Sequence, residues 1–225
     1  MDKINDALYT PDMNSNLTFP ETLRTAEKHL SRRDPVLRNI IKKHGECRIQ
    51  PHTKYLQTLV GSIISQQLST KAAETIQKRF LALYAPAKFP KPELIVTTPD
   101  DELRAVGLSY QKLGYIKDLA SKVADGSVNL KRLPKMSDEE IINELIKVKG
   151  IGVWTVHMFL IFSLGRMNVL PTGDLGIKNA IHRGYGLTEA PKPTVMEAIA
   201  ENNKWHPYCS IASWYLWRSL ENKEM

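Results

Sequence analysis

The sequence contains few cysteines, and the two it has, Cys47 and Cys209, lie far apart in 225 residues. Two such cysteines cannot supply the four ligands of a structural zinc or iron–sulfur site. Free thiols in a reducing compartment are expected rather than a disulfide. We therefore expect no iron–sulfur cluster, no other cofactor and no metal bound by side chains.

Long apolar segments are also missing. Residues 1–6 form no apolar signal core, and runs such as residues 158–162 are too short to cross a bilayer. We expect no membrane partner and an intracellular protein. It would act in the cytoplasm or nucleoid of a bacterium or archaeon, or in the nucleus of a eukaryote.

Hydrophobic residues make up 42% of the chain and charged residues 24%, as in ordinary globular proteins. The formal net charge is +7, and such a balance favours an anionic partner, most commonly nucleic acid. A basic enzyme with some other substrate is the alternative.

Helical spacing dominates the pattern, and no run alternates convincingly with period two. Leu23, Ala26 and Leu30 share one helical face in a pattern that turns helical at Glu21, and residues 55–65 read as a buried helix. The proline-rich residues 90–92 read as a loop, residues 112–124 as a helix, and residues 137–140 as a capping pattern at a helix start. Residues 1–20 are polar and read as a loose N-terminal arm. We predict an all-α fold of about ten helices.

The most informative segment is residues 145–155, where an amphipathic helix breaks at Gly150-Ile151-Gly152 and a second helix begins at once. Glycine permits positive φ and lets the backbone lie close to a ligand. The amides of Gly150, Gly152 and Val153 could then face one phosphate oxygen at a helix N-terminus. A plain tight turn between helices is the alternative.

Asp174 follows the hairpin in the string Pro171-Thr172-Gly173-Asp174-Leu175. An Asp at the start of a helix is commonly only a cap. After a phosphate-binding hairpin, a lone carboxylate also suggests chemistry on nucleic acid.

Five stretches of the sequence carry a family resemblance: residues 65–73, 106–112, 145–164, 170–177 and 214–217. Together they resemble the helix-hairpin-helix DNA glycosylase superfamily. Within it, they are most similar to the 3-methyladenine DNA glycosylase II branch of alkylation repair. The resemblance spans about residues 55–217. It implies two helical lobes with the active-site cleft between them, in a compact member without the extra N-terminal β-domain of some relatives.

The resemblance also implies a division of the chain. Residues 1–20 would be the arm and residues 21–225 the glycosylase domain. Lobe 1 would hold about residues 55–130. Lobe 2 would combine residues 21–54 with 131–225, carrying the hairpin and Asp174.

In this family the catalytic Asp falls at Asp174. A carboxylate beside C1′ stabilises the positive charge that develops on the sugar and can orient water. An alkylated base can leave as a neutral group, so one carboxylate suffices. Bifunctional members carry a nucleophilic lysine where this chain has Trp154, which implies a monofunctional enzyme that leaves an abasic site without nicking the strand.

The resemblance assigns three side chains to the base pocket: Trp154, Tyr208 and His157. For His157, simple packing is an equal alternative. The family often has an arginine after the residue equivalent to Tyr208, but this chain has Cys209. We assign Trp214 and Trp217 to the core.

The turn between two helices at Gln66-Gln67-Leu68-Ser69 matches the loop that fills the hole left by a flipped base. Gln67 aligns best with the wedge, and Leu68 is the alternate, with Ser69 beside them. Candidate phosphate contacts are Lys71, Lys112 and Lys149. As in some relatives, a monovalent cation could sit on the carbonyls of Ile146, Val148 and Ile151.

The sequence therefore predicts a monomeric, monofunctional DNA glycosylase that removes 3-methyladenine-type and 7-methylguanine-type purines from double-stranded DNA by base flipping. Two alternatives stay open. One is a non-catalytic protein that binds damaged DNA, and the other is a glycosylase for another lesion class, such as oxidised bases or mismatches.

Overall fold

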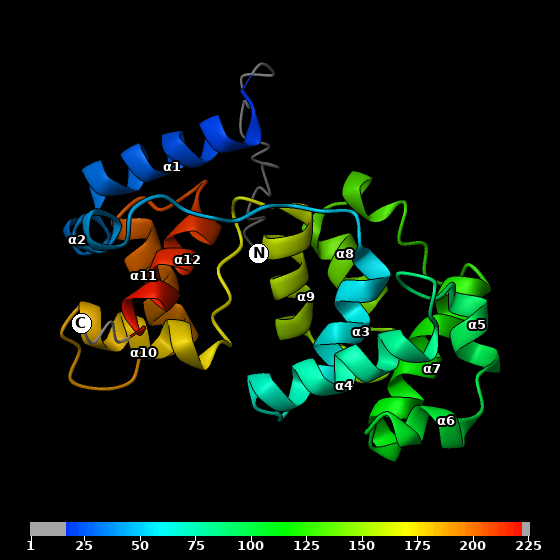
Figure 1. The fold of residues 1–225 in the computed structure, drawn as a ribbon. Coiled ribbons are helices and arrows are strands. Elements are labelled where there is room, and N and C mark those ends of the chain that lie inside the picture. The colour runs from blue at the N-terminus through cyan, green and yellow to red at the C-terminus, as the bar shows by residue number, and fades with distance from the viewer. Residues whose placement is uncertain (1–16, 222–225) are drawn as a thin grey trace, which may run out of the picture. The chain divides into compact units, whose positions relative to one another are not determined.

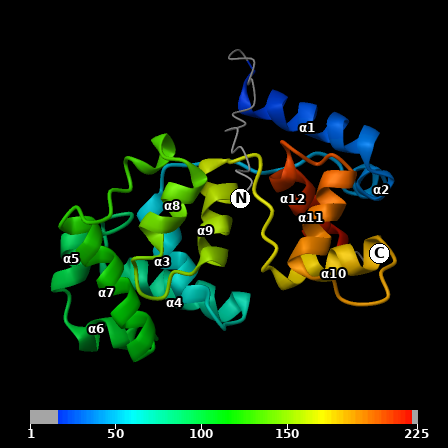
Figure 2. The same ribbon diagram turned by 180° about the vertical axis from the view of Figure 1, so that it is seen from behind.

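The computed structural model describes residues 17–221, within which every regular element is helical and no strand occurs (Figures 1 and 2). This confirms the predicted all-α class. The contacts divide the chain into two compact units. Unit 1 takes residues 1–48 and 167–225, and unit 2 takes residues 49–166.

This division differs from the expected lobes, because residues 131–166 belong to unit 2 with the central helices. The reason is packing: the helix that follows the hairpin lies against the buried helix of residues 55–65. The hairpin and Asp174 therefore belong to different units. Most of the expected N-terminal arm lies outside the described residues.

Unit 2 is built around the apolar helix α3, whose residues Leu59, Val60, Ile63 and Ile64 are buried. It packs against α4, α7 and α9, while α7 also covers α5 and α6 (Figure 1). The elements are α3 (Tyr55–Ser65), α4 (Thr70–Leu83), α5 (Pro92–Thr97), α6 (Asp100–Ala105), α7 (Tyr110–Ala124), the 3₁₀ turn η1 (Leu133–Lys135), α8 (Asp138–Leu145), α9 (Val153–Phe159) and the π-helical turn η2 (Leu160–Leu164).

Unit 1 joins two N-terminal helices to three C-terminal ones (Figure 2). Helix α12 packs against α1, α2 and α10, so it forms the centre of this unit. Its buried side chains include Ile211, Tyr215 and Leu216. The elements are α1 (Phe19–Arg33), α2 (Pro35–His44), α10 (Leu175–Gly184), α11 (Pro193–Asn202) and α12 (Cys209–Ser219).

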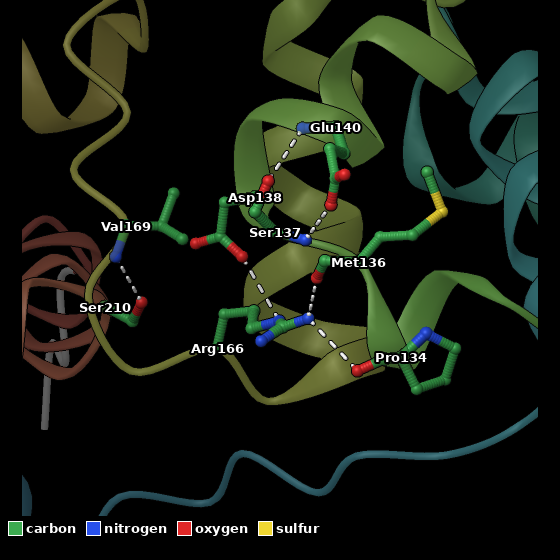
Figure 3. A network of polar contacts seen from close by, with 8 residues as sticks. All are labelled: Pro134, Met136, Ser137, Asp138, Glu140, Arg166, Val169 and Ser210. Carbon is green, nitrogen blue, oxygen red and sulfur yellow. Dashed lines mark hydrogen bonds and ion pairs between the residues drawn. The ribbon is translucent and has the colours of Figure 1, made fainter. Parts of the chain in front are cut away.

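Local bonds fix the start of α8 and the end of η2 in unit 2 (Figure 3). Ser137 and Glu140 form the predicted capping box, which satisfies amides that lack a partner within the helix. Arg166 donates to the carbonyls of Met136 and Pro134 at 2.6 and 3.3 Å, and it pairs with Asp138 at 3.2 Å. Burial raises the pKa of Asp138, and the charge of Arg166 opposes that effect.

Several helix boundaries differ from prediction. Helix α1 begins at Phe19, capped by Thr18, two residues before the expected start at Glu21. The loop predicted at residues 90–92 ends where α5 begins at Pro92, because proline is well suited to the first position of a helix. Helix α7 begins at Tyr110 after the Ser109 cap, not at Lys112.

Candidate functional site

The hairpin between α8 and α9 has the predicted turn. Gly150 adopts φ 81°, and a side chain there would collide with the ring of Tyr115. Only glycine fits this position, for both conformational and steric reasons. Gly152 differs, because a Cβ there would meet open space. Gly152 is therefore not required by packing within the protein. The absence of a side chain there instead keeps the N-terminus of α9 accessible.

The amides of the hairpin are available to a ligand. Within residues 17–221, no acceptor is recorded for the backbone amides of Gly150, Gly152 and Val153. Val153 is also exposed. Unpaired amides at the start of a helix form a site for an anion such as a phosphate.

The other hairpin groups have mixed roles. The amide of Lys149 donates to Asp118 Oδ2 at 2.9 Å, while its side chain is exposed. Of the three candidate cation-binding carbonyls, that of Val148 accepts the amide of Ile151 at 3.1 Å. The carbonyls of Ile146 and Ile151 stay candidates, as does the remaining lone pair of Val148.

Trp154 and His157 lie one turn apart on α9. Trp154 is 49% exposed, which is unusual for so large an apolar side chain. His157 is half-buried, and burial lowers its pKa against the opposing charge of Asp138. An exposed indole next to open amides is suited to stacking on a ligand.

The turn between α3 and α4 presents the predicted wedge residues to solvent. Gln67 has φ 55°, and both its side chain and that of Leu68 are exposed. Ser69 caps α4, accepting the amide of Ala72 at 3.3 Å. Lys71 follows in the first turn of α4, where it is exposed and has no recorded ion pair in the described part of the chain.

Lys112 has partners within the protein that the sequence did not indicate. Its ammonium donates to the carbonyls of Ile64 and Gln66, each at 2.7 Å. Burial lowers its pKa. A half-buried ammonium already bound to two carbonyls holds the end of α3, whereas the sequence suggested a surface phosphate contact.

Asp174 begins α10 in unit 1 and is only 9% exposed. Its Oδ1 accepts the amide of Ile177 and the indole N–H of Trp217, both at 2.8 Å. These two donors fix the orientation of the carboxylate. Trp217 was assigned to the core, but it is half-buried and bonded to Asp174, so that assignment was wrong. The indole N–H of Trp217 needs a hydrogen-bond partner when it is buried, and this was the feature of the sequence that could have indicated a polar contact.

Tyr208 also lies in unit 1, at the start of α12, where it is half-buried. Its ring meets that of His29 edge to face, with centroids 5.3 Å apart. The next residue, Cys209, is buried, and burial raises the pKa of its thiol to about 12. A thiol that stays neutral cannot replace the arginine that the family often has there.

Residues 17–221 contain no cluster of three or more His, Cys, Asp or Glu side chains that could bind a metal ion. None of their helices combines the length and apolarity needed to cross a bilayer.

Comparison with known proteins places these elements in a family. Residues 60–206 match the model of the HhH-GPD superfamily base excision DNA repair proteins. The chain belongs to this superfamily. The open amides of the hairpin and the capped Asp174 both fall within the matched region.

Individual relatives agree with this placement. A Bacillus subtilis protein is 38% identical over 81% of this chain, which spans 64% of that protein's length. DNA-3-methyladenine glycosylase 1 of Schizosaccharomyces pombe is 36% identical, with 93% of each chain covered. A solved structure of the S. pombe 3-methyladenine DNA glycosylase in complex with abasic DNA has a TM-score of 0.79 at 33% identity, covering 89% of this chain and 98% of that one.

Proposed function

We propose that this protein is a monofunctional DNA glycosylase that hydrolyses the N-glycosidic bond of alkylated purines in double-stranded DNA and acts as a monomer. The observation that carries the proposal is Asp174, a carboxylate held in one orientation by the Ile177 amide and the Trp217 indole. The names of the relatives support this substrate class, since several are DNA-3-methyladenine glycosylases.

Binding would begin at the DNA backbone. The open amides of Gly150, Gly152 and Val153 would bind one phosphate, and the side chains of Lys149 and Lys71 would add positive charge. Such contacts position the protein without reading sequence. Gln67, or Leu68 as the alternate, would fill the gap in the stack.

The flipped base would stack on aromatic side chains. Trp154 offers an exposed indole face, and Tyr208 and His157 are the other candidates. A purine alkylated on a ring nitrogen is cationic, and aromatic faces attract cations. This favours charged lesions over neutral bases.

The chemical step would need one carboxylate. The C1′–N bond breaks and its electron pair leaves with the base, so a cationic base departs neutral. Asp174 stabilises the positive charge left on the sugar, and water adds to C1′ while giving up a proton to the Asp174 carboxylate. Trp154 carries no amine, so the product is an abasic site in an unbroken strand.

The test is a base-release assay with duplexes that contain 7-methylguanine, 3-methyladenine, 8-oxoguanine, hypoxanthine or ethenoadenine. We expect release of the two methylated purines. Release confined to another lesion would move the enzyme to a different substrate class. Tight binding to damaged duplex without release would favour a non-catalytic damage-binding protein.

A further inference from the structure

A hollow of about 450 Å³ lies in unit 2 between the 66–69 turn, the start of α7 and the hairpin. Its lining includes Gln66, Gln67, Lys112, Tyr115, Gly150 and Trp154. Both predicted DNA-contacting elements therefore border one hollow, and α7 contributes the wall between them. The bonds across this wall determine whether the two elements can move independently.

Gln66 links the turn directly to the hairpin. It ends α3, is half-buried, and its Nε2 donates to the carbonyl of Gly150 at 2.8 Å. Gly150 is the residue whose positive φ makes the hairpin turn. A single side chain thus connects the residue before the wedge to the centre of the phosphate-binding turn.

Lys112 holds the other side of Gln66. Its ammonium bonds the carbonyls of Ile64 and Gln66 at the C-terminus of α3, where a positive charge is favourable. Gln67, which follows Gln66, adopts φ 55°, a backbone conformation that is unfavourable for a residue with a Cβ. Such a conformation persists only where its surroundings hold it.

Helix α7 also supports the hairpin. The ring of Tyr115 lies against Gly150, and Gln111 donates to the Tyr115 hydroxyl at 2.7 Å. One turn further on, Asp118 accepts the amide of Lys149 at 2.9 Å. The same helix therefore anchors both the turn and the hairpin.

We propose that Lys112 and Gln66 are positioning residues that join the 66–69 turn to the hairpin, so that wedge insertion and phosphate binding occur as one event. This inference rests on the proposed function, because it assigns DNA contacts to both elements. It predicts that neither Lys112 nor Gln66 needs to touch DNA in order to affect binding.

The test compares Lys112→Met and Gln66→Met with matched controls. Lys117→Met removes the same charge from the same helix, where Lys117 pairs with Asp100. Gln77→Met removes another glutamine amide that donates to a carbonyl, that of Gly61 at 3.4 Å. The probe is a duplex with an abasic-site analogue and 2-aminopurine beside it, whose fluorescence reports unstacking.

We expect each test variant to lower affinity for this duplex about tenfold and to reduce the fluorescence change, with both controls close to wild type. The double variant should be little weaker than either single one, because both break one connection. The slope of log K against log salt should stay unchanged for Lys112→Met. A lost phosphate contact would instead lower that slope by about one.

A slope lowered by about one, additive losses, or test variants that match wild type would overturn the inference. Thermal unfolding of each variant shows whether weaker binding comes from loss of the folded protein or from loss of the connection. Gln66→Met is the milder variant because it keeps every charge. If wild-type protein shows no preference for the abasic duplex, the proposed function has failed. If wild type shows that preference and the variants share it, only the inference has failed.

Discussion

Two aspartates of unit 1 begin helices in the same way, yet they have different surroundings. Asp34 caps α2 and Asp174 caps α10, and each also accepts the indole N–H of a tryptophan. Asp34 is fully buried, its Oδ1 accepts two backbone amides, and its Oδ2 accepts the Trp205 indole N–H and the Tyr185 hydroxyl. Asp174 keeps 9% exposure, and both its helix amide and its indole bond to Oδ1.

The difference teaches that one local motif can serve two purposes. Asp34 joins α2 to Tyr185 and Trp205, which are distant in sequence. Burial of the Tyr185 hydroxyl and its hydrogen bond to Asp34 keep the pKa of Tyr185 far above its ordinary value. Asp34 therefore stabilises unit 1. Asp174 is oriented by the same types of bond, and at 9% exposure it is less deeply buried than Asp34.

The largest expected effect is that of Asp174→Asn. The asparagine can still cap α10 and accept the Trp217 indole, so stability should change by less than about 1 kcal/mol. The rate of base release should fall about 10²–10³-fold, because the negative charge is lost. Single-turnover kinetics with excess enzyme measure this rate. A variant within about threefold of wild type would remove Asp174 from the chemistry.

Asp34→Ala should show the opposite behaviour. It leaves the buried donors of Tyr185 and Trp205 without an acceptor and removes the α2 cap, so the free energy of unfolding should fall by about 3–5 kcal/mol. Urea unfolding measures this loss. The rate of base release per folded molecule should match wild type. A selective loss of rate would mean that the two aspartates do not differ as we infer.

The two tryptophans provide a matched pair for the same comparison. Trp217→Phe removes one hydrogen bond to Asp174 and should lower the rate about tenfold, with little effect on stability. Trp205→Phe removes a bond to the buried Asp34 and leaves a void, so it should cost about 2–4 kcal/mol of stability without changing the rate. Similar effects of both variants on the rate would contradict the distinction between a reacting Asp174 and a structural Asp34.

Gly176→Ala tests the orientation of Asp174 with the smallest change. The new Cβ would lie 3.0 Å from Asp174 Oδ1 and 3.0 Å from Trp217 Cδ1, so the carboxylate must shift slightly. We expect the rate to fall about fivefold, since small displacements of reacting groups are costly. Gly173→Ala, whose Cβ would meet open space, is the control and should keep the wild-type rate.

Local patterns in the sequence predicted much of the fold. The Gly150 turn, the Ser137 capping box and the apolar helix α3 follow from residues close together in the chain, and the structure confirms each. The family resemblance pointed to Asp174 as the catalytic residue. The helix-cap pattern around Asp174 could not alone distinguish it from Asp34, which also caps a helix. Their differences depend on partners that lie more than forty residues away.

The same limit explains the errors at the candidate site. The bonds of Lys112 to two carbonyls were not foreseen, because these partners lie 48 and 46 residues away and leave no local pattern. Trp217 was assigned to the core because large aromatics usually are, and its bond to Asp174 again spans 43 residues. The lobe boundary was misplaced because the packing of α9 on α3 is a long-range property.

The most direct test of the central claim, a single-carboxylate hydrolase, counts three products from one reaction of wild-type protein with methylated duplex. These are the free bases, the abasic sites and the strand breaks before alkali treatment. A hydrolase with a single carboxylate should give equal numbers of free bases and abasic sites, with no enzyme-dependent breaks. Breaks in proportion to released bases, or tight binding with no base released, would contradict it.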